Sequence, residues 1–140
     1  MEGQVRYTAI VDGKAGAYGV VIPDVPGCVA MGRTIDEALA NSAEVLAEFA
    51  KLEEVAGGSL PRPRRPEEIL ADPAYAEDIA AALVLASVPL IREAGKPVRA
   101  NLSLDPGILA AIDAAAQRMG LTRSAMVEAL AREGLPKLVA

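Results

Sequence analysis

One short segment near the C-terminus constrains the fold of this 140-residue chain more than any other part of its sequence. In residues 98–104 (VRANLSL) apolar and polar side chains alternate, which is the period of a strand with one buried face. A lone strand leaves backbone groups unpaired, and so small a unit cannot bury its own apolar face. The segment therefore predicts antiparallel pairing with a second copy. The apolar positions are Val98, Ala100, Leu102 and Leu104, and the polar positions are Arg99, Asn101 and Ser103.

Two helices are predicted directly after this strand. Apolar residues recur there at intervals of three and four, which is the spacing of a helix with one buried face. The boundaries carry residues that favour helix caps and stops. These are Ser103 or Asp105 as the first cap, Pro106 in the first turn, Gly120 as the left-handed end, Thr122 as the second cap, and Gly134 with Pro136 as the stop. The apolar positions are Ile108, Leu109, Ile112, Ala116 and Met119, then Met126, Val127 and Leu130.

A paired ribbon of this kind has the chemistry of a DNA-binding surface. Two antiparallel copies present two sets of Arg99, Asn101 and Ser103, and such side chains can bond to base edges in a major groove. The free amides at the start of the second helix can hold a DNA phosphate. The alternative is a helical dimerisation tail without any role in DNA binding. The candidate phosphate-binding positions are Thr122, Arg123 and Ser124.

The same segment resembles a ribbon-helix-helix repressor domain in pattern and spacing over residues 96–135 (KPVRANLSLDPGILAAIDAAAQRMGLTRSAMVEALAREGL). The resemblance implies an intertwined homodimer whose two-stranded ribbon enters the major groove of operator DNA. By motif position, Arg99, Asn101 and Ser103 face the bases, and the start of the second helix holds the DNA backbone. Asn at the middle ribbon position fits the family, whereas Ser103 is too small for strong base discrimination.

The charge distribution divides the chain into two parts. Residues 1–95 carry 8 basic and 15 acidic side chains, a net charge of -7, whereas residues 96–140 carry 6 and 4, a net charge of +2. An acidic front part repels DNA and attracts a basic protein partner. We therefore expect a partner-binding domain at 1–92, a linker at 93–96 and the ribbon-helix-helix domain at 97–135.

The front part has the pattern of a small α+β domain with an antiparallel sheet. Thr34 with Glu37 forms a capping box, and Gly57-Gly58 ends the helix that follows. Residues 59–66 (SLPRPRRP) are expected to be a connector, followed by short helices only up to Ala82. The helix stripe is Ile35, Leu39, Leu46 and Phe49, widened by Ala38, Val45 and Leu52. The expected strands are 5–11, 18–22, 28–31 and 82–90, with a Gly-rich turn through Asp12, Gly13 and Gly16.

The order of the front motifs resembles the HicB antitoxin family. The motifs are Tyr7, the strand 20–22, PDVPGC at 23–28, Gly32-Arg33-Thr34 and Glu37-Ala38. The region 60–80 departs from the family because it is longer and richer in Pro, Arg and Ala. The resemblance implies a degenerate ribonuclease H-like domain that binds HicA, a small basic toxin similar to a double-stranded-RNA-binding domain that cleaves messenger RNA. It also implies that the C-terminal domain represses the operon's own promoter.

The candidate toxin-binding residues are acidic. A toxin that binds RNA must be basic on its working face, and a front domain of charge -7 is complementary to it. The candidates are Glu37, Glu44 and Glu48 on the helix, and Asp24 in a turn that we expect to be exposed. Taken singly, each of these carboxylates is also typical of an ordinary solvated side chain.

Catalysis and metal or cofactor binding have little support. The chain contains no histidine, the commonest general base and metal ligand, and Cys28 is predicted to be a small core residue. Asp12, Asp24 and Asp36 resemble a magnesium-binding set, but each stands where a turn or cap favours Asp. The glycines of 13–19 lack the Lys-Ser/Thr pair of a phosphate loop. We expect the basic cluster in the connector to be solvated, and it comprises Arg62, Arg64 and Arg65.

Two functions remain open. The first is an antitoxin that neutralises a toxin and represses its own operon. The second is a stand-alone repressor whose front domain senses a small molecule or oligomerises. We expect a cytoplasmic protein, because the N-terminus lacks a signal pattern and the apolar stretch 79–91 is too short to span a membrane. A homodimer is expected, and pairing of front domains into a tetramer is left open.

Overall fold

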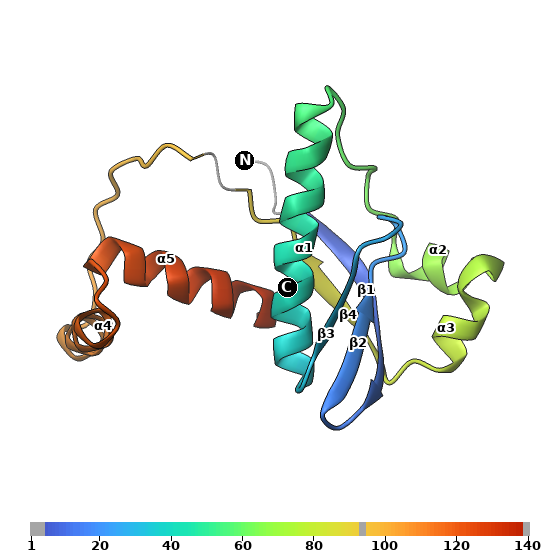
Figure 1. The fold of residues 1–140 in the computed structure, drawn as a ribbon, viewed down its shortest axis with the longest axis horizontal. Coiled ribbons are helices and arrows are strands. Elements are labelled where there is room, and N and C mark those ends of the chain that lie inside the picture. Colours follow the sequence, from blue (N-terminus) through green and yellow to red (C-terminus); the bar gives the residue numbers. More distant parts are fainter. Residues whose placement is uncertain (1–4, 93–94, 139–140) are drawn as a thin grey trace. The chain divides into compact units, whose positions relative to one another are not determined.

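The computed structural model describes residues 5–92 and 95–138. The described residues fall into two compact units. The front unit lies within Met1–Arg92 together with Pro136–Ala140, and the tail unit lies within Glu93–Leu135. Figure 1 labels the helices and strands of both.

The front unit is built on a four-stranded antiparallel sheet in the order β3-β2-β1-β4. The strands are β1 (Arg6–Lys14), β2 (Ala17–Val21), β3 (Val29–Gly32) and β4 (Val84–Pro89). Each of the four strands predicted for the front unit is present, with boundaries shifted by one to three residues. The α+β class and the small antiparallel sheet are thereby confirmed.

The turn between β1 and β2 is shorter than the sequence suggested. Asp12 pairs with Gly19 and Gly13 pairs with Tyr18 in the β1–β2 ladder, so the predicted turn through Asp12 and Gly13 is wrong. The ladder continues to the pair Lys14 and Ala17, which leaves a two-residue turn. A glycine with positive φ in that turn, Gly16, lets the strands pair to their ends.

Helix α1 (Ile35–Val55) begins as predicted, with Thr34 as its N-cap. The Thr34 hydroxyl accepts from the Glu37 amide at 3.0 Å, but the Glu37 carboxylate accepts from the amide of Arg33 rather than Thr34. Only half of the predicted capping box is therefore formed. Leu52 is exposed, contrary to its predicted place in the apolar stripe, because the last turns of α1 run past the sheet (Figure 1).

The main core lies between one face of the sheet and α1. Alternate residues of β1, Tyr7, Ala9 and Val11, are buried there with aliphatic side chains of the other strands and of α1. Cys28 is part of this core, as predicted, and burial raises the pKa of its thiol to about 11. A thiol in this state is a poor nucleophile at neutral pH. The α1 residues that are buried are Ala38, Leu39, Ser42, Ala43, Leu46 and Ala50.

The other face of the sheet carries the short elements that follow the connector. These are α2 (Pro66–Leu70), the 3-10 turn η1 (Pro73–Tyr75) and α3 (Ala76–Ala80), and they lie on the opposite side of the sheet from α1 (Figure 1). Ile10 of β1 and Ile69 of α2 are both buried outside the main core. The prediction of a connector followed only by short helices is confirmed.

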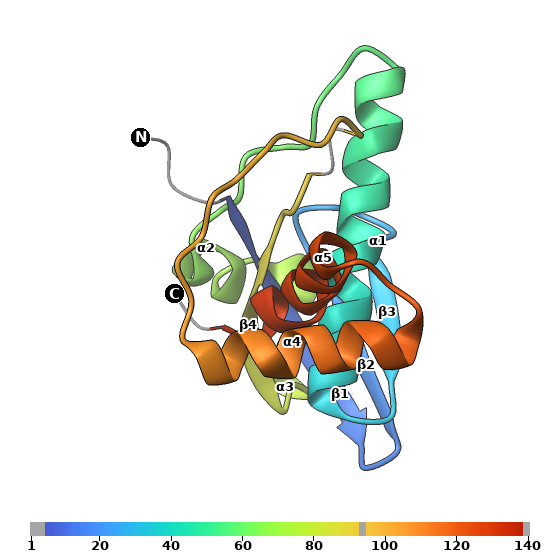
Figure 2. The same ribbon diagram turned by 90° about the vertical axis from the view of Figure 1, so that its left-hand side faces the viewer.

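The tail unit contains α4 (Pro106–Met119) and α5 (Arg123–Gly134), joined by a short turn (Figure 2), and η2 (Leu135–Lys137) follows. The Asp105 carboxylate caps α4 by accepting from the amides of Gly107 and Ile108 at 2.8 and 3.2 Å. Gly120 ends α4 in the left-handed conformation with φ of 67°. These helix boundaries were predicted.

Residues 98–104 form no strand in this single chain, and each of them is exposed. The strand predicted at 98–104 is therefore absent from the single chain. A strand is defined by its hydrogen-bonded neighbour, and no described segment of the chain pairs with these residues.

Candidate functional site

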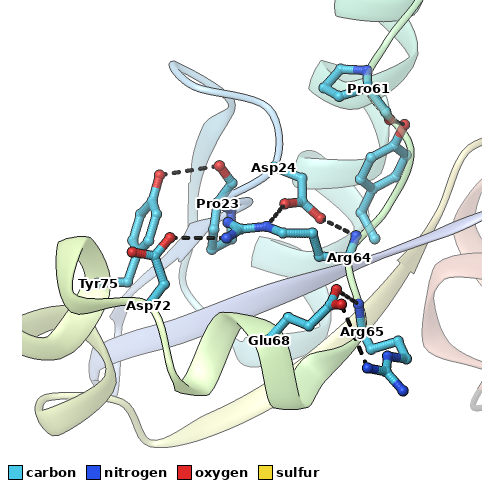
Figure 3. Close-up of polar contacts among 9 residues, drawn as sticks. Pro23, Asp24, Pro61, Arg64, Arg65, Glu68, Asp72 and Tyr75 are labelled. Atoms are coloured by element: carbon cyan, nitrogen blue, oxygen red, sulfur yellow. Dashed lines mark hydrogen bonds and ion pairs between the residues drawn. The ribbon is translucent and has the colours of Figure 1, made fainter.

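The predicted exposed turn at Asp24 is instead a buried ion-pair site. The Asp24 side chain is only 4% exposed. Its carboxylate accepts from Arg64 Nε at 2.6 Å and from the Arg64 amide at 2.7 Å (Figure 3). The prediction that Asp24 is exposed and available to a partner is therefore wrong. The turn is folded inward by hydrogen bonds from the amides of Val25 and Cys28, and the connector covers its carboxylate.

Arg64 also forms an ion pair with a second carboxylate, that of Asp72. Its Nη1 donates to Asp72 Oδ2 at 2.9 Å, so one guanidinium joins two carboxylates from different segments (Figure 3). These bonds raise the pKa of Arg64 and, together with the amide of Ala74, lower the pKa of Asp72. We call Asp24, Arg64 and Asp72 the Arg64 clamp. The prediction of a solvated basic cluster is wrong for Arg64, whereas Arg62 is exposed.

Two tyrosines add to this network: Tyr7 bonds to the connector, and Tyr75 of η1 bonds to the turn that carries Asp24. The Tyr7 hydroxyl donates to the carbonyl of Pro61 at 2.6 Å, and the Tyr75 hydroxyl donates to the carbonyl of Pro23 at 3.1 Å (Figure 3). Burial, followed by the charge of Asp24, raises the pKa of Tyr7. Because the protein itself satisfies the hydroxyls and charges of this network, the network holds the connector and η1 against β1 and the turn after β2.

The three acidic candidates on α1 form one exposed stripe. Glu37, Glu44 and Glu48 are exposed and lie within about 60° of one another around the helix axis, since successive residues turn by roughly 100°. Asn41, which the sequence analysis missed, lies on the same stripe. Its side-chain amide donates to the carbonyl of Met31 on β3 at 2.8 Å, which ties α1 to the outer edge of that strand.

The DNA-binding candidates of the tail unit are accessible but not assembled. Arg99, Asn101 and Ser103 are exposed, and without a paired strand they share no defined face. The Thr122 hydroxyl caps α5 by accepting from the amide of Ala125 at 3.1 Å. Ser124 is exposed in the first turn of α5.

Arg123 is held by a residue that the sequence analysis missed. Its Nε and Nη2 donate to the two oxygens of Asp113 on α4 at 2.8 and 2.9 Å. This bidentate pair lowers the pKa of Asp113 and raises that of Arg123. Both side chains remain largely exposed, so the pair orients Arg123 at the start of α5 without burying its charge.

No local pattern in the sequence predicts the ion pairs Asp24–Arg64 and Asp113–Arg123. Asp24 and Arg64 are 40 residues apart, and Asp113 and Arg123 are 10 apart across a turn. Among residues 5–92 and 95–138 no group of His, Cys, Asp and Glu is arranged to hold a metal ion. In the same ranges, the structure has no helix with the length and apolarity needed to cross a membrane.

The structure defines a small α+β domain followed by a separate helical unit. The chain belongs to the family described as HicB_like antitoxin of bacterial toxin-antitoxin system, whose sequence model matches residues 7–131. The family resemblance predicted from the front motifs is thereby confirmed.

Solved structures agree with this assignment. The antitoxin HicB of Burkholderia pseudomallei is 31% identical with a TM-score of 0.54, and the match covers 94% of this chain and 98% of that one. The antitoxin HicB3 is 26% identical with a TM-score of 0.52, covering 92% and 96%. An uncharacterized 14.9 kDa protein of Haemophilus phage HP1 is 27% identical over 107 residues, which are 76% of this chain and 78% of that protein.

Proposed function

We propose that this chain neutralises a small basic HicA-type toxin with its front unit and represses its own operon with its tail unit. The observation that carries the proposal is the match of the antitoxin family to residues 7–131, which include most of both units. On this proposal the protein acts in the cytoplasm by occupying surfaces, and it is not an enzyme. The stand-alone repressor has no comparable support from the family.

The front unit has the charge that the toxin partner requires. A toxin that cleaves messenger RNA presents Lys and Arg side chains to phosphates, and an acidic protein competes for the same surface. Residues 1–95 carry a net charge of -7. After the correction at Asp24, the exposed carboxylates of Glu37, Glu44 and Glu48 are the remaining candidates for this contact. The degenerate ribonuclease H-like ancestry of the front unit is part of the same proposal.

The tail unit has exposed apolar side chains of the kind that a ribbon-helix-helix dimer buries. Val98 and Leu102, on one side of the alternating segment, are 88% and 65% exposed in the single chain. Pairing of two such segments removes these side chains from water and supplies the missing backbone partners. The resulting ribbon then carries Arg99, Asn101 and Ser103 on one face for base edges. Arg123 and Ser124 at the start of α5 are the proposed phosphate contacts.

The test is affinity capture of the tagged chain from its native host, followed by purification and co-expression of the captured protein. We expect a basic protein of fewer than about a hundred residues that arrests growth alone and is neutralised by this chain. Recovery of no toxic partner contradicts the antitoxin proposal. A chain that binds duplex DNA from its own upstream region without any such partner supports the stand-alone repressor instead.

A further inference from the structure

The two edge strands of the front sheet, β3 and β4, differ in what surrounds their outward-facing backbone groups. On β4, the amide of Leu90 bonds to Val5, so alternate residues of this strand, including Ser87 and Pro89, direct their backbone outward. Arg6 Nη1 donates to the Ser87 carbonyl at 3.4 Å, and Pro89 has no amide to offer. The β4 edge is therefore interrupted at Pro89 and occupied at the Ser87 carbonyl, as many natural edges are, whereas the outward backbone groups of Leu85 have no strand partner among the described residues.

The β3 edge is open. The amide of Ile22 bonds to the carbonyl of Cys28, and the register then directs the backbone groups of Val29 and Met31 away from β2. Asn41 occupies the Met31 carbonyl at 2.8 Å. The Val29 amide, the Val29 carbonyl and the Met31 amide have no strand partner among the described residues.

Apolar side chains accompany this open edge. Val29 and Met31 are 56% and 64% exposed. They stand opposite Val21 and Gly19, and so belong to the sheet face away from α1. Exposed apolar side chains on an unpaired edge strand are the combination that ordinarily invites another strand.

The charge beside the edge indicates what kind of strand fits. Asn41 belongs to the same stripe of α1 as Glu37, Glu44 and Glu48, so these carboxylates belong to the helix that borders β3, on its side facing away from the core. Two cations are also near: Arg33 follows β3, and Lys51 lies near the C-terminal end of the stripe. Three carboxylates against these two cations leave the border acidic, which favours an incoming segment that carries Lys or Arg.

We propose that the β3 edge receives an extended, basic segment of the toxin as a fifth strand of the sheet. The proposal rests on the proposed function and names the surface that performs it. Backbone hydrogen bonds at Val29 and Met31 supply affinity, their side chains pack against apolar positions of the segment, and the acidic stripe selects its cationic side chains. The toxin's positively charged surface is thereby withheld from RNA.

The backbone part is tested with Val29→Pro, which removes an outward amide without removing a bond to β2. The matched control is Ser87→Pro, which removes an outward amide on the β4 edge together with the Ser87 hydroxyl that accepts from Arg6. Binding of each full-length variant to the purified toxin from the capture experiment is measured by titration calorimetry. We expect Val29→Pro to weaken binding by at least about tenfold, the effect of losing one or two backbone hydrogen bonds, and Ser87→Pro to leave it unchanged.

The charge part is tested with the double variant Glu44→Lys and Glu48→Lys. The matched control is Glu67→Lys and Glu77→Lys, which makes the same change in net charge on exposed positions of α2 and α3. We expect the α1 variant to lose affinity steeply and the control to lose little. Equal losses in both pairs mean that only net charge matters, and that result overturns the proposed surface.

Amide exchange of the unchanged protein provides a reading that does not depend on how the variants fold. The amides of Val29 and Met31 are expected to exchange more slowly in the toxin complex, and unchanged rates overturn the proposal. A mass that falls in Val29→Pro while toxin binding persists shows that the edge pairs with a second copy, which also overturns it. Failure of the unchanged chain to bind a toxin is a distinct result, because it contradicts the proposed function itself.

Discussion

The front and tail units treat their apolar side chains in opposite ways. In the front unit, Ile22, Leu46 and Val11 are completely or almost completely buried between the sheet and α1. In the described part of the tail unit, Ala116 and Met126 are the only buried apolar residues, whereas Val98 and most of the α4 stripe lie in water or partly so. The front unit buries its apolar side chains by itself, whereas the single tail unit leaves most of its apolar side chains at least partly exposed.

The ion pairs of the two units also differ in burial. Arg64 joins the buried Asp24 to Asp72 and ties distant segments together, whereas Arg123 and Asp113 form an exposed pair. A buried carboxylate that loses its partner is costly, but an exposed pair contributes little to stability. The clamp therefore belongs to the fold of the front unit. The exposure of this pair is consistent with the proposal that Arg123 exchanges its carboxylate for a DNA phosphate.

The largest expected effect breaks the tail unit alone. Leu102→Asp places a carboxylate of each copy in the proposed ribbon core, at a cost on the order of several kcal/mol each. Light scattering should give half the mass of the unchanged protein, and binding to its upstream DNA should be lost. Toxin binding should persist because the front unit is unaltered. An unchanged mass contradicts the ribbon dimer.

The matching change in the front unit is Leu46→Ala. Leu46 is completely buried, and its truncation should lower the free energy of unfolding by about 2–5 kcal/mol. Thermal unfolding followed by circular dichroism measures the loss. Leu102→Ala serves as the control, because it should alter the unfolding of the front unit by less than about 0.5 kcal/mol. Comparable losses in both variants contradict the division into one complete and one incomplete core.

The clamp is tested with Arg64→Ala, which leaves the Asp24 carboxylate buried without its guanidinium. We expect a clearly lower melting temperature than for Arg62→Ala, which removes an exposed arginine of the same connector. Asp24→Asn, combined with Arg64→Ala, should recover part of the loss because the uncompensated charge is gone. Equal melting temperatures for the two arginine variants mean that the connector is held by other contacts.

Arg99→Ala sharpens the comparison without altering either fold. Removal of one base-contacting arginine should weaken binding to the operator by about 1–3 kcal/mol and relax specificity at one base pair. Gel-shift titrations against the upstream DNA and a set of single-base variants measure both quantities. Neutralisation of the toxin should be unaffected, and its loss in a folded variant contradicts the assignment of the two activities to different units.

The smallest expected effect is a dependence on pH in the front unit. Hydrogen bonds from Arg64 and Ala74 lower the pKa of Asp72 in the folded state, so its contribution is present above the unfolded pKa and is lost as pH falls. Asp72→Asn keeps the side-chain cap but removes the charge. The difference in melting temperature between the two proteins should therefore shrink from pH 7 towards about pH 3. A constant difference contradicts a role for the charge.

Local patterns predicted much of the fold. The caps at Thr34, Asp105 and Thr122 and the left-handed end at Gly120 follow from residue chemistry within a few positions, and all four are present. The four front strands were predicted with less accurate boundaries, and residues 98–104, which alternate most regularly, form no strand in the single chain. The α1 stripe was extended one turn too far at Leu52, because periodicity records which side chains are apolar but not where the opposing sheet ends.

The candidate surfaces were predicted less completely than the elements that carry them. Glu37, Glu44 and Glu48 were found because they are charged and share one side of a helix. Asp24 was misplaced because its exposure depends on Arg64, which lies 40 residues away in a segment without regular structure. The open β3 edge escaped notice for a related reason: a sequence does not reveal which strand lies at the margin of a sheet.

The sequence by itself determined the elements of the front unit, the two tail helices, their caps and the opposite charges of the two parts, and it predicts that residues 98–104 need a partner. These properties depend on neighbours within a few residues or on simple sums of charge. Only the tertiary structure decided that Asp24 is buried, that Arg123 is held by Asp113, and that β3 and β4 are the edges of the sheet. Those outcomes depend on which backbone groups and charges, far apart in the sequence, come into contact in the fold. Local sequence patterns do not predict such contacts.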